Sequence, residues 1–304
     1  MIETFVAHLS DGVNLSCRSA GRKNAPLLLF LHGFPEGAFV WDQMMLALAP
    51  RFRCVAPNLR GYEASFTPDE VEAYKPRALA GDVASLVQYL DAPVVALVAH
   101  DWGGVVGWSL GALAPSWLQR LVIINSPHPA TFLRELKHSH EQRQASAYMN
   151  FLCLPQAEQM LFADDYARLW QFFTMMGAVE GSQPGAGWLT EEVMEQYRQV
   201  WRHGIDGALN YYRASPMRPP IGQDDPVGAL ELPAEMTQVR VPTLVLWAEA
   251  DIALRPALLE GLQEHVADLH VVRIPSATHW VVHEQPELLV SEIVRFLDQA
   301  DQRG

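Results

Sequence analysis

The chain has 304 residues, of which 49% are hydrophobic and 19% are charged. These values fit one large α/β domain with an insertion and exclude a disordered chain or a coiled coil. The net charge of −13 disfavours nucleic acid and anionic membranes as partners. The three cysteines are widely spaced and predict neither a disulfide framework nor a metal site; they are Cys17, Cys54 and Cys153.

The sequence also bears on the location of the protein. Residues 1–5 lack the basic region and apolar run of a signal peptide, and no apolar stretch reaches the length of a membrane span. We therefore expect a cytoplasmic protein that does not associate with membranes. The oligomeric state is not determined by the sequence, and a homodimer remains open.

Short apolar runs alternate with helical patterns along the chain. Continuous apolar runs bounded by turn residues predict strands that are buried on both faces of a parallel sheet. These runs cover residues 27–31, 94–99, 121–124 and 243–247, and residues 269–274 are predicted as a further strand. Helical patterns between and after them cover residues 37–49, 77–90, 102–113 and 286–297. This alternation predicts an α/β fold with a mostly parallel, doubly wound sheet.

Residues 126–235 interrupt the alternation. The segment is helical in pattern and rich in Phe, Trp, Tyr and Met, and the sheet pattern resumes at Val241. The simplest interpretation is a core of residues 1–125 and 236–304, with a helical cap of residues 126–235 inserted into it. Such a cap is expected to enclose an apolar pocket over the carboxyl edge of the sheet, where open α/β sheets bind ligands.

Asp101 lies at the junction of a predicted strand and a predicted helix. The small residues Ala99 and Gly103 flank it at the spacing of a nucleophile elbow, a tight turn with strained dihedral angles at its centre. The helix that follows favours an anion at its N-terminus. The alternative is that Asp101 only caps this helix.

An aspartate at an elbow restricts the chemistry. Its reference pKa is about 4, so the side chain is already an anion at neutral pH. Attack on an acyl group gives a labile anhydride, whereas attack on an sp³ carbon gives an alkyl ester that a second step hydrolyses. Asp101 therefore indicates an epoxide or an alkyl halide as substrate, and disfavours an ordinary ester.

Ester hydrolysis needs a base and a group that orients it. Among 11 histidines, only His279 follows the last predicted strand at the expected place. Asp251, just past the predicted strand 243–247, is the candidate acid, with Glu249 as its competitor, while Asn125 supplies no acid after the preceding strand. The chain order of nucleophile, acid and base is the one expected for this fold.

An oxyanion hole is expected from two backbone N–H groups. One belongs to Trp102, directly after the nucleophile, and the other to Phe34, in the loop after the strand 27–31. Pro35, the next residue, has no N–H to offer.

Together these segments resemble the α/β-hydrolase superfamily, and within it the epoxide hydrolases. The resemblance covers nearly the whole chain and rests on four segments, which are His-Asp-Trp-Gly-Gly at 100–104, His-Gly-Phe-Pro-Glu at 32–36, the acid loop ending at Asp251 and Thr-His-Trp at 278–280. It implies hydrolysis of a small apolar epoxide to a vicinal diol, with no metal or organic cofactor. One departure is Glu63, which stands where the family usually has glycine.

The resemblance extends to two tyrosines of the cap. Epoxide hydrolases use such a pair to protonate the ring oxygen, and by similarity the pair here is Tyr148 and Tyr212. Tyr166 and Tyr211 are the rivals. Adjacent helical residues point about a quarter-turn apart, so Tyr211 and Tyr212 are not expected to face the pocket together.

Two alternatives stay open. A haloalkane or haloacid dehalogenase would share Asp101, His279 and Asp251 and would use donors such as the Trp102 indole to hold the halide. A receptor with this fold would bind a small apolar ligand without turning it over.

Overall fold

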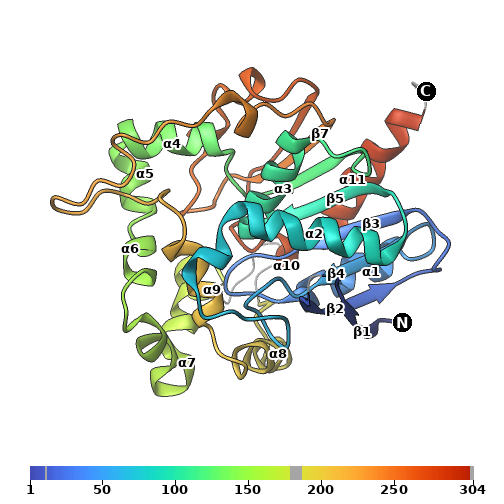
Figure 1. The fold of residues 1–304 in the computed structure, drawn as a ribbon, viewed down its shortest axis with the longest axis horizontal. Coiled ribbons are helices and arrows are strands. Elements are labelled where there is room, and N and C mark those ends of the chain that lie inside the picture. Colours follow the sequence, from blue (N-terminus) through green and yellow to red (C-terminus); the bar gives the residue numbers. More distant parts are fainter. Residues whose placement is uncertain (11, 179–186, 302–304) are drawn as a thin grey trace.

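The computed structural model describes residues 1–10, 12–178 and 187–301, and a single twisted sheet runs through its centre (Figure 1). Within these residues the sheet has eight strands in the order β1-β2-β4-β3-β5-β6-β7-β8. β1 and β2 are antiparallel to their neighbours, and every later pair is parallel. The strands are β1 (Glu3–His8), β2 (Asn14–Ala20), β3 (Leu27–Leu31), β4 (Arg53–Pro57), β5 (Val94–His100), β6 (Leu121–Ile124), β7 (Thr243–Ala248) and β8 (Leu269–Ile274).

The prediction of a mostly parallel α/β sheet is confirmed. The four apolar runs and the predicted strand 269–274 correspond to β3 and to β5–β8, with ends that differ by at most one residue. The strands β1, β2 and β4 were not predicted. β1 is the edge strand and is mostly exposed, β2 alternates apolar and polar residues, and β4 has only three apolar residues between Arg53 and Pro57.

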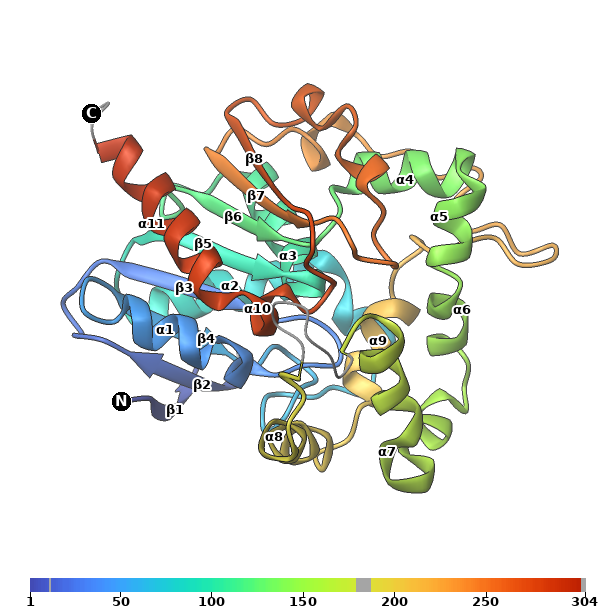
Figure 2. The same cartoon turned by 180° about the vertical axis from the view of Figure 1, so that it is seen from behind.

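Helices cover both faces of the sheet. The helices α2 and α3 lie on the face seen in Figure 1, and α1, α10 and α11 lie on the opposite face, seen in Figure 2. The pattern at 37–49 is a 3-10 turn (Ala38–Trp41) followed by a short helix, rather than one continuous helix. The bounds are α1 (Asp42–Leu48), α2 (Pro76–Leu90), α3 (Asp101–Leu113), α10 (Val281–Glu284) and α11 (Pro286–Asp301).

Among the described residues, six α-helices lie between β6 and β7, where the sequence predicts an inserted helical cap. They stand beside the carboxyl ends of the parallel strands in Figures 1 and 2. Residues 179–186 of the predicted cap lie outside the described residues. The helices are α4 (Pro129–His138), α5 (His140–Ala145), α6 (Tyr148–Leu152), α7 (Ala157–Met175), α8 (Glu191–Trp201) and α9 (Asp206–Arg213).

The central strands form the core of the protein. All residues of β3 and β6 are buried, as expected for strands with helices on both faces. Among the described residues, no helix combines the length and apolar character needed to cross a bilayer.

Candidate active site

Asp101 lies at a tight turn between β5 and α3. It is the first residue of α3, and its φ of +48° places it in the left-handed region that side chains other than glycine rarely adopt. Gly33 makes this approach feasible, because a Cβ there would lie 2.3 Å from the Asp101 Cβ. The turn projects the carboxylate from the carboxyl edge of the sheet.

The loop after β3 and the loop after β6 hold the turn in place. The Phe34 N–H donates a hydrogen bond of 2.8 Å to Asp101 Oδ1, and the Ser126 hydroxyl donates to the Asp101 carbonyl. The Asp101 side chain is 14% exposed, which leaves its other oxygen accessible from the cavity.

His279 stands between two carboxylates. Its Nδ1 donates to Asp251 Oδ2 over 2.7 Å, and its Nε2 lies 3.8 Å from Asp101 Oδ2. Asp251 is buried, and its oxygens also accept from the Asn125 amide and from the backbone N–H groups of Ala253 and Leu254. These contacts determine both the tautomer and the orientation of the imidazole.

The charges of the site shift the pKa values of this pair. Burial raises the pKa of Asp251, but the charge and hydrogen bond of His279 outweigh it, so the pKa falls below its ordinary value. Burial lowers the pKa of His279, but the charge of Asp251, its hydrogen bond and the charge of Asp101 outweigh it and raise the pKa to about 9. The resting site therefore favours an imidazolium between two carboxylates.

The competing acid lies elsewhere. Glu249 forms an ion pair with Arg273, with 2.8 Å between Oε1 and Nη1. Asn125, which follows β6, contacts Asp251 instead of replacing it. The structure thus brings Asp251, and not Glu249, to His279.

A buried network behind the site was not anticipated from the sequence. His100 shares a hydrogen bond of 3.0 Å with Glu36 and contacts the carbonyl of His279 through its other ring nitrogen. Glu36 also accepts from the hydroxyl of Tyr197, on the cap helix α8, and lies 3.5 Å from His283 Nε2. The only signal in the sequence is that Glu36 and His100 lie within the two loop motifs.

Two tyrosines from the helices between β6 and β7 face Asp101. Tyr148 begins α6 and Tyr212 lies in α9, and their ring centroids are 6.2 Å apart. Burial and the charge of Asp101 raise the pKa of Tyr148, and burial, Tyr148 and Asp101 raise that of Tyr212 well above its ordinary value. Both phenols therefore remain protonated donors.

The rival tyrosines point away from the nucleophile. The Tyr211 hydroxyl donates to the carbonyl of Arg60, and the ring of Tyr166 packs against Phe162 and Trp201. Neither Tyr211 nor Tyr166 lines the cavity at Asp101.

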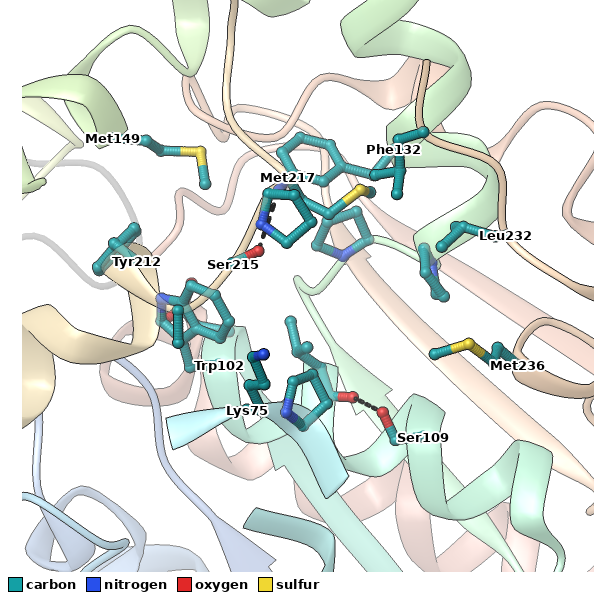
Figure 3. A pocket seen from close by; sticks show the side chains of 18 of the residues that line it. Lys75, Trp102, Ser109, Phe132, Met149, Tyr212, Ser215, Met217, Leu232 and Met236 are labelled. Carbon is teal, nitrogen blue, oxygen red and sulfur yellow. Dashed lines mark hydrogen bonds between the residues drawn. The ribbon is translucent and has the colours of Figure 1, made fainter. Parts of the chain in front are cut away.

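The cavity in front of Asp101 has a volume of about 450 Å³ and a largely apolar wall (Figure 3). Trp102 and Tyr212 lie together on one side of it, and three methionines surround the remaining space in Figure 3, namely Met149, Met217 and Met236. This volume suits a small organic molecule. Within residues 1–10, 12–178 and 187–301, no group of three or more His, Cys, Asp or Glu side chains is arranged to hold a metal ion.

Trp102 has two features that bear on the chemistry. It is the second residue of α3, where a backbone N–H has no acceptor within the helix. Its indole ring packs edge to face against Tyr212, with 5.0 Å between the ring centroids. The first feature fits the predicted oxyanion hole, and the second places the indole beside one of the two tyrosines at the cavity.

Comparisons with known proteins agree with this arrangement. Residues 26–286 match the family model described as alpha/beta hydrolase fold. Epoxide hydrolase 3 of Mus musculus is 31% identical over 95% of this chain and 75% of its own length.

Solved structures of epoxide hydrolases are also similar to this chain. One from a study of novel epoxide hydrolases in metagenomes from hot environments has a TM-score of 0.85 and 34% identity, covering 98% of this chain and 99% of the other. A Bacillus megaterium epoxide hydrolase, solved with an inhibitor, has a TM-score of 0.86 and 29% identity, covering 97% and 100%. The chain belongs to the α/β-hydrolase fold family and, within it, to the epoxide hydrolases.

Proposed function

We propose that this enzyme converts a small apolar epoxide to a vicinal diol through an alkyl ester on Asp101. The observation that carries the proposal is the tyrosine pair, Tyr148 and Tyr212, which faces the nucleophile across the cavity. An epoxide oxygen leaves as an alkoxide and needs a proton donor, whereas a halide needs none. We further propose that residues 126–235 act as the cap.

In the first step, an Asp101 oxygen forms a bond to one epoxide carbon and the bond from that carbon to the ring oxygen breaks. The oxygen takes the phenol proton of Tyr148 or Tyr212, which leaves a hydroxyl on the substrate and a phenolate in the cap. The Phe34 N–H already contacts Asp101 Oδ1 and holds the other oxygen in an attacking position.

Once the ester has formed, the imidazolium of His279 releases its proton to solvent, and it regains a proton from solvent after turnover. In the second step, neutral His279 removes a proton from water, and the water oxygen bonds to the ester carbonyl carbon. The N–H groups of Phe34 and Trp102 stabilise the negative charge on the carbonyl oxygen. The intermediate then collapses, its diol oxygen takes the proton from His279, and the new Asp101 carboxyl returns its proton to the phenolate. The balance is one epoxide and one water to one diol.

Alkylation of Asp101 also prepares the second step. The carboxylate charge raises the pKa of His279 and of both tyrosines. When the ester forms, this charge is lost, so the phenols become stronger acids and the imidazole releases its proton more readily. The loss of one charge thus favours protonation of the alkoxide and then activation of water.

The test is the intact mass of a His279→Gln variant after exposure to a panel of epoxides and alkyl halides. We expect a mass increase equal to a whole epoxide, located on Asp101, because the ester forms and then persists. A second variant with both His279→Gln and Asp101→Ala is the control and should gain no mass. Adducts from the halides alone would instead establish a dehalogenase, and no adduct from any compound would favour a receptor.

A further inference from the structure

The helix α9 rests directly on the backbone of the loop that follows β4, which passes beside it in Figure 1. A Cβ added at Gly207, the second residue of α9, would lie 2.4 Å from the Gly61 Cα and 2.8 Å from the Gly61 carbonyl oxygen. The approach is reciprocal, since a Cβ added at Gly61 would lie 2.8 Å from the Gly207 Cα. Carbon atoms in optimal contact are about 3.5–4.0 Å apart, so a side chain at either position would push the helix and the loop apart.

The loop that receives α9 is held firmly to the core. Arg60 forms a buried ion pair with Asp82 of α2, with 2.7 Å between Nε and Oδ2, and it also donates to the Ala73 carbonyl over 3.0 Å. The Gly61 N–H donates to the Phe66 carbonyl over 2.9 Å. The φ of Gly61 is +83°, a conformation that glycine adopts without strain. Because the loop is fixed in this way, a wider separation has to come from movement of α9.

The contact lies on the face of α9 next to the one that carries Tyr212. Gly207 and Tyr211 are four residues apart and therefore share a face of the helix, and the Tyr211 hydroxyl donates to the Arg60 carbonyl over 2.8 Å. Tyr212 is the next residue, so it projects about 100° further around the axis, into the cavity that Asp101 also lines. The depth at which Gly207 contacts the loop thus determines where the Tyr212 hydroxyl lies relative to the nucleophile.

We infer that Gly207 is a positioning residue for the reaction, because its contact with Gly61 holds α9 at the depth where Tyr212 reaches the epoxide oxygen. Helix stability does not explain this glycine, which is the poorest helix former after proline. A methyl group at position 207 would displace the helix by about 1 Å, and a misplacement of that size can cost about 100-fold in rate. The inference rests on the proposed function and specifies what places one of its two proton donors.

The test is Gly207→Ala, with rapid-quench measurement of ester formation and decay on phenyl glycidyl ether. Ester formation should slow by about 10- to 100-fold. Ester hydrolysis should change far less, because water activation and the oxyanion hole use no group of α9. Gly81→Ala is the matched control, since it makes the same exchange in the helix α2 where the new Cβ meets no atom within 4 Å, and both of its rates should equal those of the wild type.

A double-mutant cycle shows whether Gly207 acts through Tyr212. In the Tyr212→Phe background, Gly207→Ala should slow ester formation by less than about twofold, because the displaced hydroxyl is already absent. In the Tyr148→Phe background, it should slow ester formation at least as much as in the wild type, because Tyr212 is then the only donor. Equal slowing in the two backgrounds would overturn the inference.

The hydrogen bond of Tyr211 is tested separately from the glycine contact. Tyr211→Phe removes the hydrogen bond and leaves the contact, so ester formation should stay within about twofold of the wild-type rate. A slowing equal to that in Gly207→Ala would assign the positioning of α9 to the hydrogen bond and overturn the inference.

Gly61→Ala approaches the same contact from the loop and serves as the test if Gly207→Ala does not fold. Its overlap is smaller, so it should slow ester formation by about three- to tenfold, and the slowing should again vanish in the Tyr212→Phe background. Unchanged ester formation in a folded Gly207→Ala, or failure of both variants to fold, would mean that the contact serves stability alone and would overturn the inference. Ester formation by the wild type would still leave the proposed function intact, whereas no ester from any epoxide of the panel would contradict both.

Discussion

The sheet edge and the cap hold their parts of the site by different means. Asp101 follows directly after β5, and Asp251 and His279 lie in the loops after β7 and β8. Hydrogen bonds of 2.7–3.0 Å determine where Asp251 and His279 lie. The cap tyrosines come from two short helices and pack edge to face against Phe34 and Phe172. The charged groups are therefore fixed by backbone and hydrogen bonds, while the proposed proton donors depend on side-chain packing.

The largest expected effect is on the rate of the first reaction step, to which the cap tyrosines should contribute far more than to the second. Tyr148→Phe and Tyr212→Phe should each slow alkylation of Asp101 by about 10- to 100-fold, and the double variant by 10³-fold or more, because the alkoxide then leaves without a proton. Hydrolysis of the ester should change far less. Rapid-quench measurement of ester formation and decay separates the two rates.

Tyr211→Phe is the control for the tyrosine pair, since its hydroxyl contacts Arg60 rather than the cavity. An equal slowing of both steps in Tyr148→Phe or Tyr212→Phe would show that the pair acts by packing alone.

Glu36 links the core to the cap, and its removal should have the next largest effect. Burial raises the pKa of Glu36, but the charges and hydrogen bonds of His100 and His283 outweigh it and keep the carboxyl ionised. Glu36→Ala should lower the free energy of unfolding by about 3 kcal/mol, since it leaves buried donors without their acceptor. Tyr197→Phe, which removes only the cap hydroxyl, should cost about 1 kcal/mol.

Urea denaturation of both variants measures these values. Equal losses in the two variants would mean that Glu36 stabilises the protein only through the cap.

The difference between core and cap also decides what the sequence can predict. Continuous apolar runs identify β3 and β5–β7, residues 269–274 are predicted as the strand that became β8, and the residues that follow these strands include Asp101, Asp251 and His279. No periodicity distinguishes Tyr148 or Tyr212 from other aromatic residues of the cap, so they were predicted from resemblance alone. The contacts of Glu36 join residues 64 and 161 positions away, which no local pattern reveals.

The pH dependence tests whether the charge of Asp101 couples the two steps. The pKa of His279 is raised from its ordinary value of 6.5 to about 9. Its contribution to the stability of the fold is therefore complete below pH 6.5 and is lost as the pH rises through 9. Wild-type thermal stability should therefore fall over this range relative to His279→Gln.

The pH at which ester hydrolysis reaches half of its maximal rate should lie at least about one unit below the midpoint of the His279 titration in the free enzyme, because the ester carries no charge. NMR titration of the imidazole and single-turnover hydrolysis rates give the two midpoints. Identical midpoints would show that Asp101 has no influence on the base.

The smallest expected effect is a difference in stability between variants of two buried tyrosines, one from each region. Tyr62 of the core and Tyr211 of the cap pack edge to face with 5.6 Å between ring centroids. The Tyr211 hydroxyl donates to the Arg60 carbonyl over 2.8 Å, whereas that of Tyr62 has no hydrogen-bond partner among the described residues. Removing the two hydroxyls should therefore have opposite consequences for stability.

Tyr211→Phe should lower the free energy of unfolding by about 1–2 kcal/mol, because it leaves a buried carbonyl without its donor. Tyr62→Phe should raise that free energy by up to about 1 kcal/mol, since it removes a polar group buried without compensation. Thermal and urea denaturation of the two variants, which differ from wild type by one oxygen each, measure the difference. A loss in Tyr62→Phe as large as that in Tyr211→Phe would mean that the Tyr62 hydroxyl makes a stabilising interaction, and the loop that holds Tyr62 would then share the dense hydrogen bonding of the sheet edge.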